Sequence, residues 1–181
     1  LVLAFHEWGR TAHNMESVSW MSHHANKNGY IAVYPQSTSF VDPIEGTVYT
    51  WNDLSCNASP GPEGPTCSES MSCDFPPECG EPRDCVWCTC NDDLAFADQL
   101  LDELESSLCI DLDRVYATGV SNGASFVHRL GCDRAERFAA IAPVGGMLSR
   151  GFNCAPDRSN PVSIMHLHGD RDSSVPVDGS E

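Results

Sequence analysis

Apolar segments that suit buried strands alternate along the chain with segments that suit amphipathic helices. The strand-like segments are continuous apolar runs, as expected for strands covered on both faces, and comprise residues 1–5, 30–34, 115–120, 138–144 and 163–168. The helix-like segments have apolar residues three and four positions apart and comprise residues 15–28, 91–108 and 122–130. A strand, a helix and a strand in succession form a parallel crossover unit. The pattern therefore predicts an α/β fold with a mostly parallel sheet and helices on both faces.

Two stretches lack this periodicity. Residues 36–50 show no regular pattern and are expected to be irregular. Residues 53–90 hold seven of the ten cysteines, several prolines and acidic residues, and little apolar sequence. Such a stretch cannot build a core of its own, so we expect cross-links to order it. The predicted organisation is one domain over residues 1–181 with a cysteine-rich insertion at 53–90.

Disulfides are the first interpretation of the cysteines. A structural zinc site from Cys85, Cys88 and Cys90 is the alternative, but the insertion lacks histidine and has no two clean C-x-x-C pairs. Three cysteines lie outside the insertion, so one of them must cross to it if all ten pair. Cys132–Cys154 with Cys109 crossing satisfies this count, and so does Cys109–Cys132 with Cys154 crossing.

The charge of the chain limits its partners. There are 26 acidic and 10 basic residues, which gives a formal net charge of -16. Nucleic acids and anionic membrane surfaces need positive charge on the protein, so neither is an expected partner. No apolar run approaches the roughly 20 residues of a membrane span. The chain starts inside a strand-like run and ends without a closing element, so we expect it to be incomplete at both ends.

One short motif indicates a chemical function. The run 115–120 leads into Gly119-Val120-Ser121-Asn122-Gly123, a G-x-S-x-G pattern between a predicted strand and a predicted helix. In that context the serine lies in a sharp, strained turn at a helix N-terminus, which favours negative charge. A Cβ on either glycine would collide where strand and helix cross. We expect Ser121 to be a nucleophile, and the alternative is an ordinary glycine-rich turn.

A serine nucleophile needs a base, and the base needs an acid that orients it. Where such serines follow a strand, the acid comes next along the chain and the histidine last. Asp172 lies in the loop after the strand that follows the serine unit, and we expect it to be the acid. Asp170, in the same loop, is expected to be a solvated turn residue.

The histidine base is not evident, because all seven histidines precede Asp172. His166 and His168 lie in or at the end of a predicted strand and are expected to be structural. His128 falls on the helix after Ser121, where a packed or surface role is expected. We therefore expect the base to lie beyond Glu181.

Two further parts of the chain are candidates for contact with the substrate. An oxyanion hole combines the backbone N–H of the residue after the nucleophile, here Asn122, with one from the loop after the first strand. That loop is residues 6–9, and Trp8 is the expected donor. Trp51 is a candidate for lining the acyl site, and an anchoring role for the insertion is the alternative.

Seven motifs in this order resemble the extracellular poly(3-hydroxybutyrate) depolymerases and the feruloyl and acetyl-xylan esterases of the α/β-hydrolase superfamily. The motifs are HEWGRTA at 6–12, GYIAVYP at 29–35, WN at 51–52, NDD at 91–93, IDLDRVYATGVSNG at 110–123, FAAIAPVGG at 138–146 and HGDRDSSVP at 168–176. The resemblance implies Ser121 as nucleophile, Asp172 as acid and a histidine further along the chain. Two features depart from the family pattern: Glu7 replaces a glycine beside the oxyanion loop, and the insertion replaces a short link.

The resemblance implies a secreted serine esterase that needs no metal or organic cofactor. Its substrate would be a polymeric or a small ester: a polyhydroxyalkanoate, a feruloyl or acetyl polysaccharide, or a short acyl ester. The alternative is a non-catalytic binding protein on a hydrolase scaffold that recognises its ligand through the insertion. The sequence indicates no oligomeric state.

Overall fold

The structure describes most of the central domain but little of the insertion. The computed structural model describes residues 1–42, 45–53, 60–61, 64–65, 91–148, 154 and 161–177. Most of the predicted insertion lies outside the described residues, as do the disulfides and the zinc alternative expected within it. Its described part is a pair of short antiparallel strands, β5 (Pro60–Gly61) and β6 (Gly64–Pro65).

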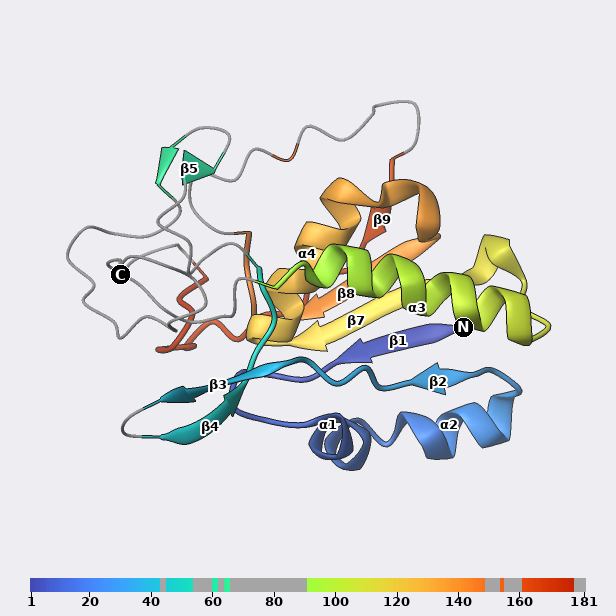
Figure 1. Cartoon of the computed structure of the whole chain (residues 1–181), viewed down its shortest axis with the longest axis horizontal. Coiled ribbons are helices and arrows are strands. Elements are labelled where there is room, and N and C mark those ends of the chain that lie inside the picture. The colour runs from blue at the N-terminus through green and yellow to red at the C-terminus, as the bar shows by residue number, and fades with distance from the viewer. Residues whose placement is uncertain are drawn as a thin grey trace.

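A five-stranded parallel sheet forms the centre of the described structure (Figure 1). In spatial order its strands are β2 (Ala32–Val33), β1 (Val2–Phe5), β7 (Tyr116–Val120), β8 (Ala140–Val144) and β9 (Ser163–Ile164). Every neighbouring pair is parallel, and Gly119 of β7 lies opposite both Phe5 of β1 and Pro143 of β8. The predicted parallel sheet is confirmed. Two of its strands, β2 and β9, are shorter than the predicted segments 30–34 and 163–168, although a single bridge from Val144 to Leu167 continues the pairing beyond β9.

Helices cover both faces of this sheet, as predicted. They are α1 (Ala12–Ser19), α2 (Met21–Asn28), α3 (Asp93–Ser107) and α4 (Asn122–Asp133), with short 3₁₀ turns η2 (Leu112–Arg114) and η3 (Ala135–Arg137). Figure 1 shows α1 and α2 on one side of the sheet and α3 and α4 on the other. Among the described residues, no helix is both long and apolar enough to span a membrane.

The single helix predicted at 15–28 is two helices, which corrects the sequence interpretation. Trp20 separates them with a φ of 56°, and its side chain is 67% exposed. The hydroxyl of Ser19 donates to the Glu16 carbonyl and accepts from the Met21 N–H, so it competes with the helical backbone bonds at the break. Val18, taken as part of the apolar stripe, is 73% exposed.

The segment expected to be irregular contains a β-hairpin, which is a second correction. Strands β3 (Ser39–Asp42) and β4 (Gly46–Tyr49) pair antiparallel, with Ser39 opposite Tyr49. Val41 pairs with Thr47 on an exposed face, whereas Val48, on the opposite face of the hairpin, is buried. The strands have four residues each, which is too short for an apolar alternation to stand out in the sequence.

The main core lies between the sheet and the layer of α3 and α4. Trp51 is its largest fully buried side chain. Its ring stacks on Phe126 of α4 at a centroid distance of 5.4 Å and meets Phe5 of β1 edge-on at 5.0 Å. Each such side chain contributes roughly 1.5–3 kcal/mol by leaving water, and aromatic pairing adds to this. This contact fixes α4 against the strand that precedes the predicted oxyanion loop.

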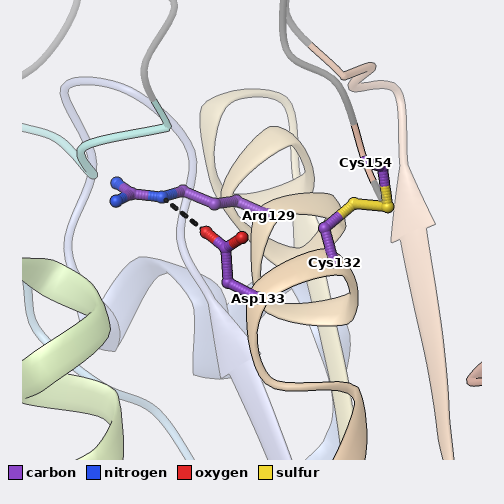
Figure 2. The surroundings of a disulfide bond; sticks show 4 residues. All are labelled: Arg129, Cys132, Asp133 and Cys154. Atoms are coloured by element: carbon purple, nitrogen blue, oxygen red, sulfur yellow. Dashed lines mark hydrogen bonds and ion pairs between the residues drawn. A yellow bond between two sulfur atoms is a disulfide. The ribbon is translucent and has the colours of Figure 1, made fainter. Parts of the chain in front are cut away.

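A disulfide links α4 to the connection between β8 and β9 (Figure 2). It joins Cys132, in the last turn of α4, to Cys154, and the two Cα atoms are 5.2 Å apart. Of the two pairings left open by the sequence, the structure contains the first, Cys132–Cys154. Cys109 is exposed and free in the described part of the chain, so its predicted crossing to the insertion stays a prediction.

Removal of this disulfide should destabilise the fold measurably. The bond closes a loop with a sequence separation of 22 residues, for which loop entropy predicts about 3 kcal/mol of stabilisation. We expect Cys132→Ala, Cys154→Ala and the double variant to lose the same free energy of unfolding in urea titrations, since any one of them removes the bond. A loss well below 1 kcal/mol in all three variants would show that the bond does not stabilise the native state.

Candidate active site

Ser121 occupies the turn between β7 and α4 in a backbone conformation that residues other than glycine rarely adopt. Its φ is 53° and its ψ is −121°. The Ser121 N–H donates to the Val144 carbonyl of β8 at 3.0 Å, and the Ser121 carbonyl accepts from Ser125 N–H in the first turn of α4. Strain of this kind costs on the order of 1–3 kcal/mol and persists only where the surroundings impose it. The strained turn predicted around Ser121 is present.

Two glycines allow this turn because no side chain would fit at either position. A Cβ on Gly119 would lie 2.5 Å from the Gly123 carbonyl oxygen, within the turn itself. A Cβ on Gly123 would lie 2.5 Å from the Phe5 carbonyl oxygen of β1. The glycines of the motif therefore serve the close crossing of α4 over β7 and β1, as the sequence predicted.

Ser121 opens into a cavity of about 540 Å³ at the carboxyl ends of the strands. His168 and Asp172 line the same cavity, together with the apolar side chains of Val120, Leu167 and Val175. The structure thus brings together Ser121 and Asp172, two residues far apart in sequence that were expected to cooperate. Asp170 is exposed and does not line this cavity, in agreement with a solvated turn residue.

The Asp172 carboxylate is held by its own loop. Its Oδ1 accepts two backbone hydrogen bonds, from the Val175 and Ser174 N–H groups, each at 2.9 Å. These bonds lower the pKa of Asp172 below its ordinary value, so the group is ionised at neutral pH. Its Oδ2 lies 3.6 Å from His168 Nε2. The same oxygen faces Gly145, where an added Cβ would lie 3.6 Å from it. One oxygen is thus fixed to the loop, and the other faces the cavity.

His168 is near the two predicted residues, but both of its ring nitrogens are engaged. Its Nε2 lies 2.7 Å from the Val175 carbonyl, which can only accept, so Nε2 carries the proton. In the neutral ring Nδ1 must then accept, and His166 Nε2 lies 3.1 Å from it. A histidine that already donates through one nitrogen and accepts through the other has no lone pair for the Ser121 proton. This agrees with the structural role expected for His166 and His168.

The remaining histidines lie elsewhere. All seven belong to the described part of the chain, and of these only His168 lines the cavity. His6 is buried, with its Nδ1 2.8 Å from the Glu7 carbonyl and its Nε2 accepting from the Ser37 N–H. Burial lowers the pKa of His6, and it lowers that of His128, on α4, to about 4. Both rings are therefore neutral packing elements at physiological pH.

The loop after β1 presents its charged residue away from the cavity. The Glu7 carboxylate forms an ion pair with Arg10 at 3.2 Å and is 43% exposed. Its carbonyl is the acceptor for the His6 ring, so that buried ring fixes the start of the loop. Gly9, directly after Trp8, donates its N–H to the Tyr49 carbonyl of β4 at 2.8 Å. Glu7, the residue that departs from the family pattern, thus lies outside the serine cavity.

Trp51 does not line the cavity, and this corrects the substrate-binding prediction. Its side chain is fully buried, and its Nε1 donates to the His6 carbonyl at 3.0 Å. The fully buried ring cannot touch a substrate in this arrangement. Its position favours the alternative, an anchor for the chain where it enters the insertion.

Asn122, the residue after Ser121, has a side chain whose hydrogen bonds the sequence did not reveal. Its Oδ1 accepts from the Thr50 hydroxyl at 3.0 Å and from the Trp51 N–H at 2.8 Å. Its Nδ2 donates to the Trp51 carbonyl and to Asp53 Oδ2, both at 3.0 Å. All four hydrogen-bonding positions of the amide are filled in a buried site. The amide ties α4 to residues 50–53, which we call the anchor segment.

The anchor segment is also tied to the start of α3, across the insertion. The Asn52 N–H donates to Asp93 Oδ2 at 2.7 Å, and the Asn52 amide donates to the Asn91 carbonyl at 2.8 Å. Arg129 of α4 donates to the Asn52 carbonyl at 2.5 Å. Burial raises the pKa of Asp93 to about 6, although the Asn52 N–H and the charge of Arg129 oppose the shift. The two ends of the insertion are therefore held together beside α4.

About half of the chain is similar in sequence to proteins named as feruloyl esterases. Over 94 residues it is 34% identical to probable feruloyl esterase C of Aspergillus niger and to feruloyl esterase C of Emericella nidulans, covering 51% of this chain and 34% of each protein. Feruloyl esterase B of Piromyces equi is 34% identical over 96 residues, which is 51% of this chain and 18% of that protein. The match thus spans about a third of these relatives or less. No family model matches the chain.

The fold agrees with this relationship. SOBER1 of Arabidopsis thaliana superposes with a TM-score of 0.60 at 15% identity, covering 98% of this chain and 77% of that chain. The chain has an α/β-hydrolase fold, and over about half of its length it is similar in sequence to proteins named as feruloyl esterases. In the hydrolase fold the active site lies at the carboxyl ends of the strands, where Ser121 and Asp172 meet here.

The sequence analysis did not place His168 in the cavity that Ser121 lines. His168 lies there because pairing with β8 continues past β9 to Leu167, and His168 follows directly after it. Asn122 was expected to act only through its backbone. The available signal was its place as a polar residue in the first turn of a largely apolar helix, which favours a side chain that is hydrogen-bonded within the protein.

The buried Asp93 gives a pH-dependent prediction. Its pKa is about 6 in the folded protein and 3.8 in an unfolded chain, so the folded state binds the proton more tightly. Between about pH 4 and 6 this group alone lowers the free energy of unfolding as pH rises, by about 3 kcal/mol in total. His128, whose folded pKa is depressed to about 4, acts in the opposite direction over an overlapping range.

Because these two effects oppose each other, Asp93→Asn should be compared with the parent at each pH. We expect the variant to gain up to about 3 kcal/mol relative to the parent between pH 4 and pH 7 in urea titrations, since an amide cannot ionise. Parallel stability curves for the two proteins would contradict the raised pKa.

Proposed function

We propose that this protein is a secreted serine esterase that hydrolyses carboxylic esters through an acyl-enzyme. The observation that carries the proposal is the meeting of Ser121 and Asp172 in one cavity of the hydrolase fold. Ser121 is the nucleophile, at the N-terminus of α4 in a strained turn. Asp172 is the acid, kept ionised by its loop.

The oxyanion of the tetrahedral intermediate is stabilised by backbone donors. The Asn122 N–H lies in the first turn of α4, where N–H groups have no partner within the helix and the helix dipole favours negative charge. The Trp8 N–H is the second proposed donor. Its support is the register of the sheet, in which Phe5, three residues earlier, lies opposite Gly119 at the end of β7. Each such donor is worth about 100- to 1000-fold in kcat.

The base of this mechanism is a histidine outside residues 1–181. Six of the seven histidines in this chain do not line the cavity, and both ring nitrogens of His168 are engaged. The added histidine would donate through Nδ1 to Asp172 Oδ2, the oxygen that its loop leaves unused. Its Nε2 would take the proton from Ser121 as the serine attacks the ester, and would return it to the leaving alcohol.

A feruloyl or related ester is the substrate class that the relatives favour. Three relatives are named as feruloyl esterases, and the apolar side chains around Ser121 suit an aromatic or aliphatic acyl group. Polyhydroxyalkanoate and acetyl-polysaccharide esters are further members of the proposed class. Secretion is proposed from the ten cysteines and the Cys132–Cys154 disulfide, since disulfides persist in oxidising compartments.

The nucleophile is tested with a fluorophosphonate probe on the full-length protein. We expect covalent labelling of the parent protein and none of Ser121→Ala, with Asp172→Asn labelled at least about 100-fold more slowly because the base loses its orienting charge. Ser125→Ala, one turn along α4, is the matched control and should be labelled like the parent. No labelling of the parent would contradict the proposal and favour the non-catalytic binding protein.

The substrate class is tested by a hydrolysis screen with the same protein. We expect turnover of methyl ferulate and of short p-nitrophenyl acyl esters, with kcat/KM highest for the aromatic acyl group. A protein that degrades polyhydroxybutyrate film but not methyl ferulate would shift the proposal to a polyester substrate. Turnover in Ser121→Ala would contradict the mechanism whichever ester is used.

A further inference from the structure

The Asp53 carboxylate contacts the residue that follows the nucleophile. Asp53 is buried, at 6% exposure, and its Oδ2 accepts from the Asn122 side-chain amide at 3.0 Å. Asn122 supplies the backbone N–H proposed above for the oxyanion, and its side chain is bonded to the anchor segment. No other residue of the anchor segment offers a charged group to this amide.

We propose that Asp53 is a positioning residue for the oxyanion hole, acting through the Asn122 side chain. The inference rests on the proposed esterase function and adds a residue to its machinery. Asp53 does not line the cavity, so we assign it a positioning role and not a catalytic one. Its effect is to fix the direction of the Asn122 N–H by holding the other end of the same residue.

The hydrogen bonds of the Asn122 amide explain why its contact with Asp53 matters. The four bonds of the Asn122 amide permit a single orientation, with the oxygen toward Thr50 and Trp51 and the nitrogen toward Trp51 and Asp53. Without the Asp53 oxygen a buried N–H is left without an acceptor, which favours rotation of the amide. Asn122 is the first residue of α4, so the bonds that hold its side chain also restrain the backbone that carries the oxyanion donor.

The same contact links the insertion to the reacting serine. Asp53 is the first residue of the insertion, and its neighbour Asn52 is bonded to Asn91 and Asp93 just beyond the other end. Arg129 lies among these groups and interacts electrostatically with Asp53, so the buried carboxylate has a counter-charge on α4. Asp53 therefore joins the start of the insertion directly to Asn122, whereas the bonds from the far end reach Asn52.

The test compares Asp53→Ala with Asp53→Asn in the full-length protein. Asp53→Ala removes the acceptor, and we expect kcat on methyl ferulate or p-nitrophenyl acetate to fall about 10- to 100-fold with KM within about threefold, as for a displaced oxyanion donor. Asp53→Asn keeps an acceptor oxygen at the same place, and we expect kcat to stay within about threefold of the parent. Rates are normalised to active sites counted with the fluorophosphonate probe.

A matched control separates positioning from stability. The Asp92 side chain caps α3 by accepting from the Ala95 N–H at 3.0 Å, and it makes no contact with Asn122. Asp92→Ala should lower the melting temperature by a few degrees, as Asp53→Ala does, but leave kcat unchanged. Should Asp53→Ala not fold, Asp53→Glu, which keeps the charge and moves the acceptor by one methylene, is expected to lower kcat with KM maintained.

Each outcome decides between the two proposals. If Asp53→Ala and Asp92→Ala have equal kcat values, the inference is overturned and the esterase proposal stands. Where Asp53→Glu is used instead, a kcat equal to that of the parent has the same meaning. Equal losses in Asp53→Ala and Asp53→Asn overturn it as well, since the hydrogen bond would not be the cause. A parent protein with neither turnover nor labelling overturns the proposed function and this inference with it. In an Asn122→Ala background, Asp53→Ala should lower kcat by less than about twofold further.

Discussion

The close crossing of α4 over β1 and β7 is the constraint on which the described structure depends. Gly119 and Gly123 let the backbones meet, and Ser121 between them is held at a φ of 53°. The strain is sustained by contacts on every side. Trp51 packs against both Phe5 and Phe126, the Ser121 N–H is bonded to β8, and the disulfide fixes the last turn of α4. The half-buried Ser121 lines the cavity at the carboxyl ends of the strands because these contacts hold its helix in place.

Ser121 and Asp172 come together because they follow neighbouring strands of the sheet, although they lie far apart in the sequence. Ser121 is bonded to Val144 at the end of β8, and Gly145 is bonded to Leu167 just before the loop that carries Asp172. The loop then closes on the carboxylate of Asp172 with two backbone bonds. The position of the acid relative to the serine is thus set by three adjacent strand ends, which a parallel sheet places along one edge.

The sequence predicts most of the fold and of the serine turn, because there the apolar pattern is long or the motif requires a particular backbone conformation. The sheet, the helix at α3 and the turn at Ser121 follow from apolar periodicity and from glycines that a crossing requires. Reasoning from the sequence failed where short-range competition decided. The Ser19 hydroxyl ends α1, and four-residue strands form the hairpin. The side-chain bonds of Asn122 join residues about 70 positions apart, and no local pattern records such a contact.

The most direct test of the account is a crystal structure of the full-length protein after reaction with a phosphonate ester. We expect the phosphorus on Ser121 Oγ and its oxygen within hydrogen-bonding distance of the Asn122 N–H. A histidine from outside residues 1–181 should lie against Asp172 Oδ2. An adduct on another residue, or a phosphonyl oxygen that points to solvent with Asp172 bonded elsewhere, would contradict the assignment of this site.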